Sequence, residues 1–168
     1  MKIEKIYFDL DGVLADFRRG VRDLCGMDPV RRTKKTATGD DAMWEAIKKV
    51  AHFYDRLEPM PGALELFNTL YERYGDACEI LSGIPKPQRG VLASGEDKTR
   101  WAHRLLNEHV IVNTVFRGEK KDYAKGPGHI LIDDWRKNIR EWEAHGGTGI
   151  LYVSAEDVLE KIGKIEKE

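Results

Sequence analysis

The sequence predicts an α/β fold, with a five-stranded parallel sheet covered by helices in three layers and a small helical insertion after the first strand. From about residue 60 onward, short apolar strand patterns alternate with amphipathic helix patterns, as in sheets built from β-α-β units. The 168 residues suit one domain with a substantial core, and residues 17–58 interrupt the alternation. We therefore expect a core made of residues 1–16 and 59–168 and a cap made of residues 17–58.

The first strand is predicted within the stretch IYFDLDGVLADF at residues 6–17, whose alternating apolar residues suit a central position in a sheet. Gly12 allows a sharp exit from this strand. An ionised carboxylate buried in such a strand costs on the order of several kcal/mol unless it is paired or bound to a metal. Ligands of open α/β sheets bind beyond the carboxyl ends of the strands, so Asp9 and Asp11 are candidate catalytic and cation-binding residues. A simple Asp-Gly turn would explain Asp11 but not Asp9.

The elements after the insertion follow in regular order. Apolar side chains repeat at helical spacing from Ala63 to Tyr74, with Pro61 near the helix start and Gly75 as a stop signal. The same criteria predict a strand at 77–81, a helix at 96–107 opened by the box-like sequence Ser94–Asp97, a strand at 110–115, a strand at 129–132, a helix at 137–144, a strand at 149–153 and a helix at 155–162.

The insertion differs in character from the rest of the chain. Its apolar residues from Met43 through Ile47 to Tyr54 indicate an amphipathic helix. The basic run at 31–35 and the residues at 36–41 read as a polar connection, and a run this short is typical of a solvated face. We expect this small helical insertion to lie over the catalytic edge of the sheet.

The composition excludes several classes of protein. With 28 Lys and Arg against 29 Asp and Glu, the net charge of −1 gives no broad basic surface for duplex nucleic acid. Cys25 and Cys78 lack the spacing of a zinc site or of a secreted disulfide framework, and Cys78 lies in an apolar run that suits the core. The N-terminus passes directly into a strand, and no apolar run approaches the roughly 20 residues of a membrane span. We expect a cytoplasmic protein without a membrane partner.

A second acidic pair, Asp133 and Asp134, follows the apolar run at 130–132 just as the first pair follows its strand. Two strands thus deliver carboxylates to one edge of the sheet. Magnesium prefers oxygen ligands, usually one or two carboxylates with waters and substrate phosphate oxygens, so the cluster suits Mg²⁺ better than zinc. An N-cap for the following helix is the alternative interpretation of this pair.

Several polar residues could hold a phosphate group at the same edge. Ser82 and Gly83 directly follow a predicted strand, where a hydroxyl and backbone N–H groups could bind phosphate oxygens. Lys98, near the start of the next helix, could neutralise phosphate charge, although an isolated helix lysine is usually solvated. Further cations precede the Asp133 strand, most of them expected to be ordinary surface charge: Arg117, Lys120 and Lys121.

Together, DLDGVLADF, a serine after the second strand, a helical lysine and a strand-terminal Asp-Asp resemble the four motifs of the haloacid dehalogenase-like (HAD) superfamily over essentially the whole chain. Within it, DGVLADF resembles the first motif of the 5'(3')-deoxyribonucleotidases. The stretch FYDRLEPMPGA at 53–63 resembles their FF..LEPxPGA segment, and Lys98 with Trp101 resembles their K..W pattern. The chain departs from that family in reading SGIP at 82–85, in a longer loop before Lys98, and in Asp-Asp-Trp at 133–135.

The resemblance implies a Rossmann-like core with a helical cap and Mg²⁺-dependent phosphatase chemistry through an aspartyl-phosphate. It makes Asp9 the nucleophile and Asp11 the general acid and base. The implied metal ligands are Asp9, Asp11 through its backbone carbonyl, and the Asp133–Asp134 pair, of which one residue ligates directly while the other orients Lys98 or a metal-bound water. The implied phosphate-binding residues are Ser82, Gly83 and Lys98.

The resemblance also suggests how the cap chooses its substrate. Phe17, Phe53 and Tyr54 fall on family positions near the active site and could form an aromatic slot for a nucleobase, with Arg117 as a further candidate contact. The alternative is that these rings, and Trp44, simply pack the cap. We expect a small phosphomonoester substrate, foremost a nucleoside monophosphate. A sugar phosphate or a polynucleotide 3'-phosphate end is the alternative, and a non-catalytic phosphate- or metal-binding module is the least favoured interpretation.

Overall fold

A computed structural model of the chain describes residues 1–30 and 40–168. Its centre is a five-stranded sheet in the order β3-β2-β1-β4-β5, in which every neighbouring pair is parallel. The strands are β1 (Lys5–Phe8), β2 (Cys78–Gly83), β3 (Ile111–Val115), β4 (His129–Asp133) and β5 (Thr148–Leu151). The predicted fold class, a parallel five-stranded sheet in an α/β protein, is confirmed.

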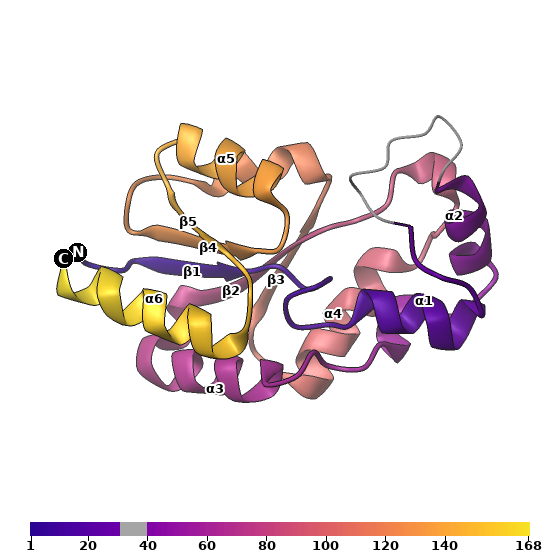
Figure 1. The fold of residues 1–168 in the computed structure, drawn as a ribbon, viewed down its shortest axis with the longest axis horizontal. Coiled ribbons are helices and arrows are strands. Elements are labelled where there is room, and N and C mark those ends of the chain that lie inside the picture. Colours follow the sequence, from indigo (N-terminus) through magenta and orange to yellow (C-terminus); the bar gives the residue numbers. More distant parts are fainter. Residues whose placement is uncertain (31–39) are drawn as a thin grey trace.

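Helices cover both faces of the sheet and make three layers (Figure 1). One face carries α3 (Ala63–Tyr74), α4 (Ser94–Leu105) and α6 (Ala155–Lys167). The opposite face carries α5 (Arg136–Ala144) and the 3-10 segment η4 (Arg117–Tyr123). None of the helices in the described ranges is long and apolar enough to cross a membrane.

Strand β1 supplies the cores of both layers because its side chains alternate between the two faces. On the larger side Phe8 packs against Phe67 of α3, with ring centroids 5.4 Å apart. On the smaller side Tyr7 packs edge-on against Trp142 of α5 at 5.5 Å, beside Leu131. A strand buried on both faces in this way holds the residues that follow it in fixed positions.

The predicted elements after the insertion are all present, with small shifts at their ends. Cys78 is buried as expected. The expected capping box at the start of α4 is wrong: the helix begins at Ser94 behind Ala93, and no side chain caps it. The carboxylate of Asp97 is buried instead, and it accepts a hydrogen bond from Arg100 at 3.1 Å.

The insertion folds into α1 (Phe17–Cys25), α2 (Asp41–Lys48) and the short 3-10 segment η1 (Phe53–Arg56). The single amphipathic helix predicted from Met43 to Tyr54 is therefore wrong in extent. The helix ends at Lys48. It cannot continue to Tyr54, because His52 takes a left-handed conformation with φ of 54° that an α-helix does not contain. The basic run at 31–35 and the connection up to residue 39 lie outside the described residues.

The segment by which the chain returns from the insertion is bound to α4. Three side chains of α4 make hydrogen bonds to this segment. The carboxylate of Asp97 binds the imidazole of His52, with 2.9 Å between Oδ1 and Nδ1. Arg104 Nη2 donates to Asp55 O at 2.7 Å, and Trp101 Nε1 donates to Leu57 O at 2.8 Å. Since Trp101 is buried, its hydrogen bond is shielded from water and fixes this segment against the core.

Phe67→Ala tests the larger core. The side chain of Phe67 is fully buried between Phe8 and Tyr71, so its truncation leaves a cavity. We expect a loss of about 3–5 kcal/mol in the free energy of unfolding, measured by urea denaturation. Leu92→Ala is the control, because Leu92 is 92% exposed and its loss should change stability by less than about 0.5 kcal/mol. Equal stability of the two variants would contradict the core described above.

Candidate active site

The carboxylates of two neighbouring strands meet at one edge of the sheet. Asp9 directly follows β1, and its backbone N–H donates to Ile132 O of β4 at 3.0 Å, which continues the strand pairing. Asp133 is the last residue of β4, and Asp134 follows it. Carboxylate oxygens of Asp9, Asp133 and Asp134 lie within 4.8 Å of one another. The geometry thus brings the two predicted acidic motifs together.

Gly12 makes room for this cluster. Its φ of 82° lies in the left-handed region, and a Cβ at this position would overlap the carboxylate of Asp134. Any other residue at position 12 would have to displace Asp134. The glycine in the first motif is therefore required by close packing against the second.

A buried lysine compensates part of the acidic charge. Lys120 of η4 places its Nζ 3.1 Å from Asp9 Oδ1 and 2.8 Å from Asp133 Oδ2, and its side chain is 5% exposed. Burial lowers the pKa of Lys120, but the carboxylates of Asp9 and Asp133 outweigh that effect and raise the pKa to about 12. In the sequence Lys120 resembles the ordinary surface cations beside it, and its position between two buried carboxylates was not predicted.

The pKa of Asp9 is set by its burial and by the charges around it. Burial raises the pKa of its carboxyl to about 7; Lys120 opposes this rise, whereas the nearby carboxylates of Asp133 and Asp134 add to it. Carboxylate oxygens of three residues gathered within 4.8 Å form a set of hard oxygen donors, the kind of ligand that Mg²⁺ prefers. The residues present therefore fit the predicted metal.

Asp133 is held in position by protein hydrogen bonds. Its Oδ1 accepts from the Trp135 N–H at 2.9 Å, and its Oδ2 accepts from Asn138 Nδ2 at 3.0 Å. Asn138 lies on α5, so this helix orients the carboxylate from outside the site. Asn138 could not be predicted from the sequence, because a lone asparagine on a helix carries no signal of its own.

The predicted phosphate-binding residues form a second group beside the carboxylates. Lys98 of α4 is 1% exposed, and its Nζ donates to Ser82 Oγ at 2.8 Å, Gly83 O at 2.8 Å and Asp11 Oδ2 at 2.9 Å. Ser82, Gly83 and Lys98 are thus brought together as expected, although Gly83 contributes its carbonyl to this contact. The ring of Tyr54 lies 4.5 Å from the same Nζ, an attractive cation–π contact.

Asp11 is bound to the second group through Lys98. Its Oδ2 accepts the hydrogen bond from Lys98, whereas its Oδ1 is buried without a hydrogen-bond partner among the residues the structure describes. The Asp11 carboxylate is not among the clustered oxygens of the candidate metal site. Its backbone carbonyl stays the predicted ligand. A carboxylate with one oxygen held and the other unengaged suits proton transfer.

The aromatic residues of the cap form one cluster. Phe17 stacks on Tyr54 at 6.3 Å and meets Phe53 edge-on at 5.8 Å. Phe53 and Tyr54 are only 1% and 3% exposed and belong to the hydrophobic core cluster. Phe17 is only partly buried, which leaves part of its ring accessible.

Arg117 does not join the cap. Its Nη1 donates to Asn138 Oδ1 at 3.0 Å and to Glu141 Oε2 at 2.9 Å, and its guanidinium lies over the Trp135 ring at 5.2 Å. These contacts bind η4 to α5 on the core. The structure therefore gives Arg117 a packing role, and these contacts do not bring it to those cap residues that are described, 17–30 and 40–58.

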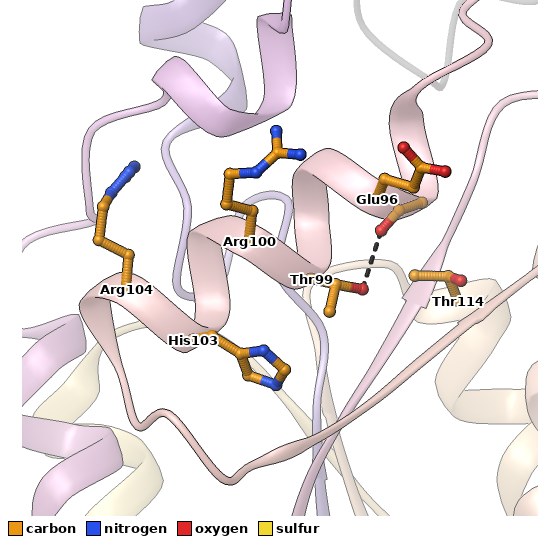
Figure 2. Close-up of a pocket in the computed structure, with 7 residues that line it drawn as sticks. Glu96, Thr99, Arg100, His103, Arg104 and Thr114 are labelled. Atoms are coloured by element: carbon orange, nitrogen blue, oxygen red, sulfur yellow. Dashed lines mark hydrogen bonds between the residues drawn. The ribbon is translucent and has the colours of Figure 1, made fainter.

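An open depression on the outside of α4 lies apart from these groups (Figure 2). None of the predicted site residues lines it. Within it, Thr99 donates its hydroxyl proton to Gly95 O at 2.9 Å, an ordinary bond within the helix. The residues that line the depression are Gly95, Glu96, Thr99, Arg100, His103, Arg104 and Thr114.

Comparison with solved structures places the fold among hydrolases of the HAD type. The chain superposes on a HAD-superfamily hydrolase from Ehrlichia chaffeensis with a TM-score of 0.62, at 15% identity and 98% coverage of both chains. A dehalogenase with an intermediate complex gives a TM-score of 0.56 at 12% identity, covering 88% of this chain and 84% of the other. The chain has the HAD-like fold, which confirms the resemblance inferred from the motifs.

Sequence comparison points to a more particular relative. The chain is 27% identical over 139 residues to a protein of Vibrio phage KVP40 named "Putative 5'(3')-deoxyribonucleotidase". The match covers 79% of this chain and 67% of the phage protein. No family model matches the chain.

Lys120→Met tests the charge balance of the carboxylate cluster. Removing the cation leaves buried carboxylates facing one another, which should destabilise the protein by about 3–5 kcal/mol. We expect a lower melting temperature in EDTA and partial recovery in millimolar Mg²⁺, measured by calorimetry. Lys121→Met, which removes the neighbouring and more exposed charge, should shift the melting temperature little. Similar behaviour of the two variants would contradict the assigned role of Lys120.

Proposed function

We propose that this protein is a magnesium-dependent phosphomonoester phosphatase that acts through an aspartyl-phosphate on Asp9, with nucleoside monophosphates as its substrates. One observation carries the proposal: the carboxylate cluster around Asp9 lies close enough to Asp11 for the Asp11 charge to act on Asp9, and Asp11 is hydrogen-bonded to Lys98, which also binds Ser82. A nucleophile, a proton carrier and a cationic phosphate cradle are the parts that such a reaction needs.

In the first half of the proposed reaction, Asp9 attacks the phosphorus. Its Oδ1 accepts hydrogen bonds from Leu10 N–H at 2.9 Å and interacts with Lys120, which fixes the orientation of the carboxylate. The new Asp9 O–P bond forms as the bond from phosphorus to the leaving alkoxide breaks. Asp11 gives its proton to that alkoxide, which leaves as an alcohol.

In the second half, water hydrolyses the aspartyl-phosphate. Asp11, now ionised, takes a proton from the attacking water, whose oxygen bonds to phosphorus while the Asp9 O–P bond breaks. Inorganic phosphate leaves, and both carboxyl groups return to their starting state. The hydrogen bond from Lys98 Nζ to Asp11 Oδ2 keeps the carboxylate aimed at the reacting group through both steps.

The phosphoryl oxygens would be held by Ser82 and Lys98. An anionic carboxylate approaches an anionic phosphate only when positive charge compensates the repulsion. Held by Asp9, Asp133, Asp134 and the backbone carbonyl of Asp11, a magnesium ion would supply that charge and polarise the phosphoryl group. Lys98 supplies a second positive charge beside Ser82 and Asp11.

Nucleoside monophosphates are proposed as substrates on two grounds. The motifs DGVLADF and FYDRLEPMPGA resemble those of deoxyribonucleotidases, and the phage relative carries such a name. In addition, the partly exposed ring of Phe17 belongs to an aromatic cluster that reaches Lys98 through Tyr54. A planar base attached to a phosphate held by Lys98 would lie within reach of such rings.

Asp9→Asn tests the nucleophile. Asparagine has the shape of aspartate but cannot form a stable acyl-phosphate, so phosphate release with Mg²⁺ should fall by about 10³-fold or more. Phosphate release is measured colorimetrically for the native protein, Asp9→Asn, and Asp122→Asn as a control at an exposed position on η4. Equal rates for Asp9→Asn and the native protein would show that the nucleophile is assigned wrongly.

A substrate panel tests the leaving group. We expect the native protein to release phosphate from 5'- or 3'-nucleoside monophosphates with a kcat/KM at least about tenfold above that for sugar phosphates or 3'-phosphorylated oligonucleotides. The tenfold margin reflects contacts that only a nucleobase makes with the cap. Activity confined to sugar phosphates would defeat the nucleotidase assignment, and absence of turnover on every ester would defeat the phosphatase assignment.

A further inference from the structure

The connection from β2 to α4 leaves the core and passes alongside the cap helix α2 (Figure 1). It contains the short 3-10 segment η3 (Pro87–Arg89). Arg89 binds the start of α2 at two points: its Nη1 donates to Asp41 Oδ1 at 2.6 Å and its Nη2 donates to Asp40 Oδ1 at 3.2 Å. A loop of the core is thereby tied to the cap. We refer to Arg89, Asp40, Asp41 and Trp44 as the Arg89 clasp.

The clasp holds one aromatic ring. Trp44 Nε1 donates to Asp40 Oδ2 at 3.2 Å, and the guanidinium of Arg89 lies 6.0 Å from the centre of the Trp44 ring. Asp40 thus accepts from the tryptophan with one oxygen and from the arginine with the other. The indole is fixed both at its edge and at its face, which leaves its rotamer little freedom.

Gly90 keeps the connection close to the cap. It has a φ of 75°, and a Cβ there would lie 3.0 Å from Lys48 Cε of α2. The left-handed turn after Arg89 therefore lets the loop pack directly on the helix. The position of Arg89 is set by this backbone approach as well as by its two carboxylate partners.

A continuous row of contacts leads from the clasp to the phosphate-binding lysine. Trp44 packs on Phe17 with ring centroids 6.2 Å apart, and Phe17 stacks on Tyr54 at 6.3 Å. Tyr54 in turn lies 4.5 Å from Lys98 Nζ. Of these three rings Tyr54 is buried, whereas Phe17 and Trp44 are partly exposed. The accessible rings thus lie farther along the row from Lys98 than the buried one.

We propose that the Arg89 clasp positions Trp44 to contact the part of the substrate that is distal to the phosphate. Arg89 thereby determines specificity for phosphomonoesters whose leaving group carries a planar heteroaromatic ring. This proposal rests on the proposed function and names a residue that selects its substrates. Arg89 acts through Trp44, so it is a positioning residue. An arginine suits this role because its planar fork can bind two carboxylates at once while its flat face lies against an indole, whereas a lysine offers only a single point charge.

The test compares two esters that differ in the leaving group. Arg89→Ala, Arg89→Lys and the native protein are assayed with thymidine 5'-monophosphate and with glycerol 3-phosphate in Mg²⁺. We expect Arg89→Ala to raise the KM for the nucleotide about tenfold, with kcat changed less than about twofold, because the reacting groups are untouched. The KM for glycerol 3-phosphate should change less than about twofold, and Arg89→Lys should restore only part of the loss.

Arg73→Ala is the matched control. Arg73 also forms an arginine–carboxylate ion pair, with Glu166 at 2.7 Å, but that pair joins α3 to α6 and leaves the cap untouched. This variant should behave like the native protein with both esters. An equal rise in KM for both esters in Arg89→Ala, or no rise for either, would overturn the proposal.

A binding measurement separates this proposal from the proposed function. Thymidine 5'-monophosphate is titrated by calorimetry into Asp9→Asn and into the double variant Asp9→Asn, Arg89→Ala, each folded as judged by circular dichroism. We expect about tenfold weaker binding in the double variant. Equal binding would overturn the role of Arg89 even if the native enzyme hydrolyses nucleotides. Weaker binding together with an inactive native protein would support the clasp and defeat the phosphatase assignment.

Discussion

The structure depends on one constraint, the balance of charge where two parallel strands end side by side. Asp9 after β1 and the Asp133–Asp134 pair at the end of β4 meet because these strands are neighbours at the centre of the sheet. Burial strengthens every electrostatic interaction among them, so uncompensated carboxylates would be costly. Lys120 supplies one positive charge from within the chain. Lys120 bridges Asp9 and Asp133, and Gly12 provides the space in which Asp134 can lie beside them.

Much of this arrangement could be predicted from the sequence, because acids directly after apolar strands are rare without a function. Lys120 could not be predicted in the same way, since its position depends on the order of the strands. β3 lies at one edge of the sheet, and β4 lies on the far side of β2 and β1. The chain must therefore recross the sheet between β3 and β4. The segment η4 belongs to this crossing and carries Lys120 between Asp9 and Asp133. Strand order is a tertiary property that residue spacing does not contain.

At the end of α2 the sequence pattern predicts a longer helix than the structure contains, because tertiary contacts override the local helical spacing. Apolar residues continue at helical spacing from Met43 to Tyr54, yet the helix ends at Lys48. His52 adopts a left-handed conformation there and lies against the buried carboxylate of Asp97. A contact between residues 45 positions apart thus decides the local backbone, and propensity gives way to packing. The capping box expected at Ser94 failed for the same reason, because Asp97 is engaged elsewhere.

Helix α4 carries two sets of side chains, one that contacts the candidate active site and one that binds the cap. This combination limits how the cap can be exchanged by protein engineering. Lys98 faces Ser82 and Asp11, whereas Asp97, Trp101 and Arg104 hold the returning segment of the cap. The segment that joins cap to core is therefore recognised by a helix that is distant from it in sequence. A cap transplanted from another protein at residues 17 and 58 would meet unmatched partners on α4. A cap can therefore be exchanged only together with α4. The cap and α4 must change together, although they are separate segments of the chain.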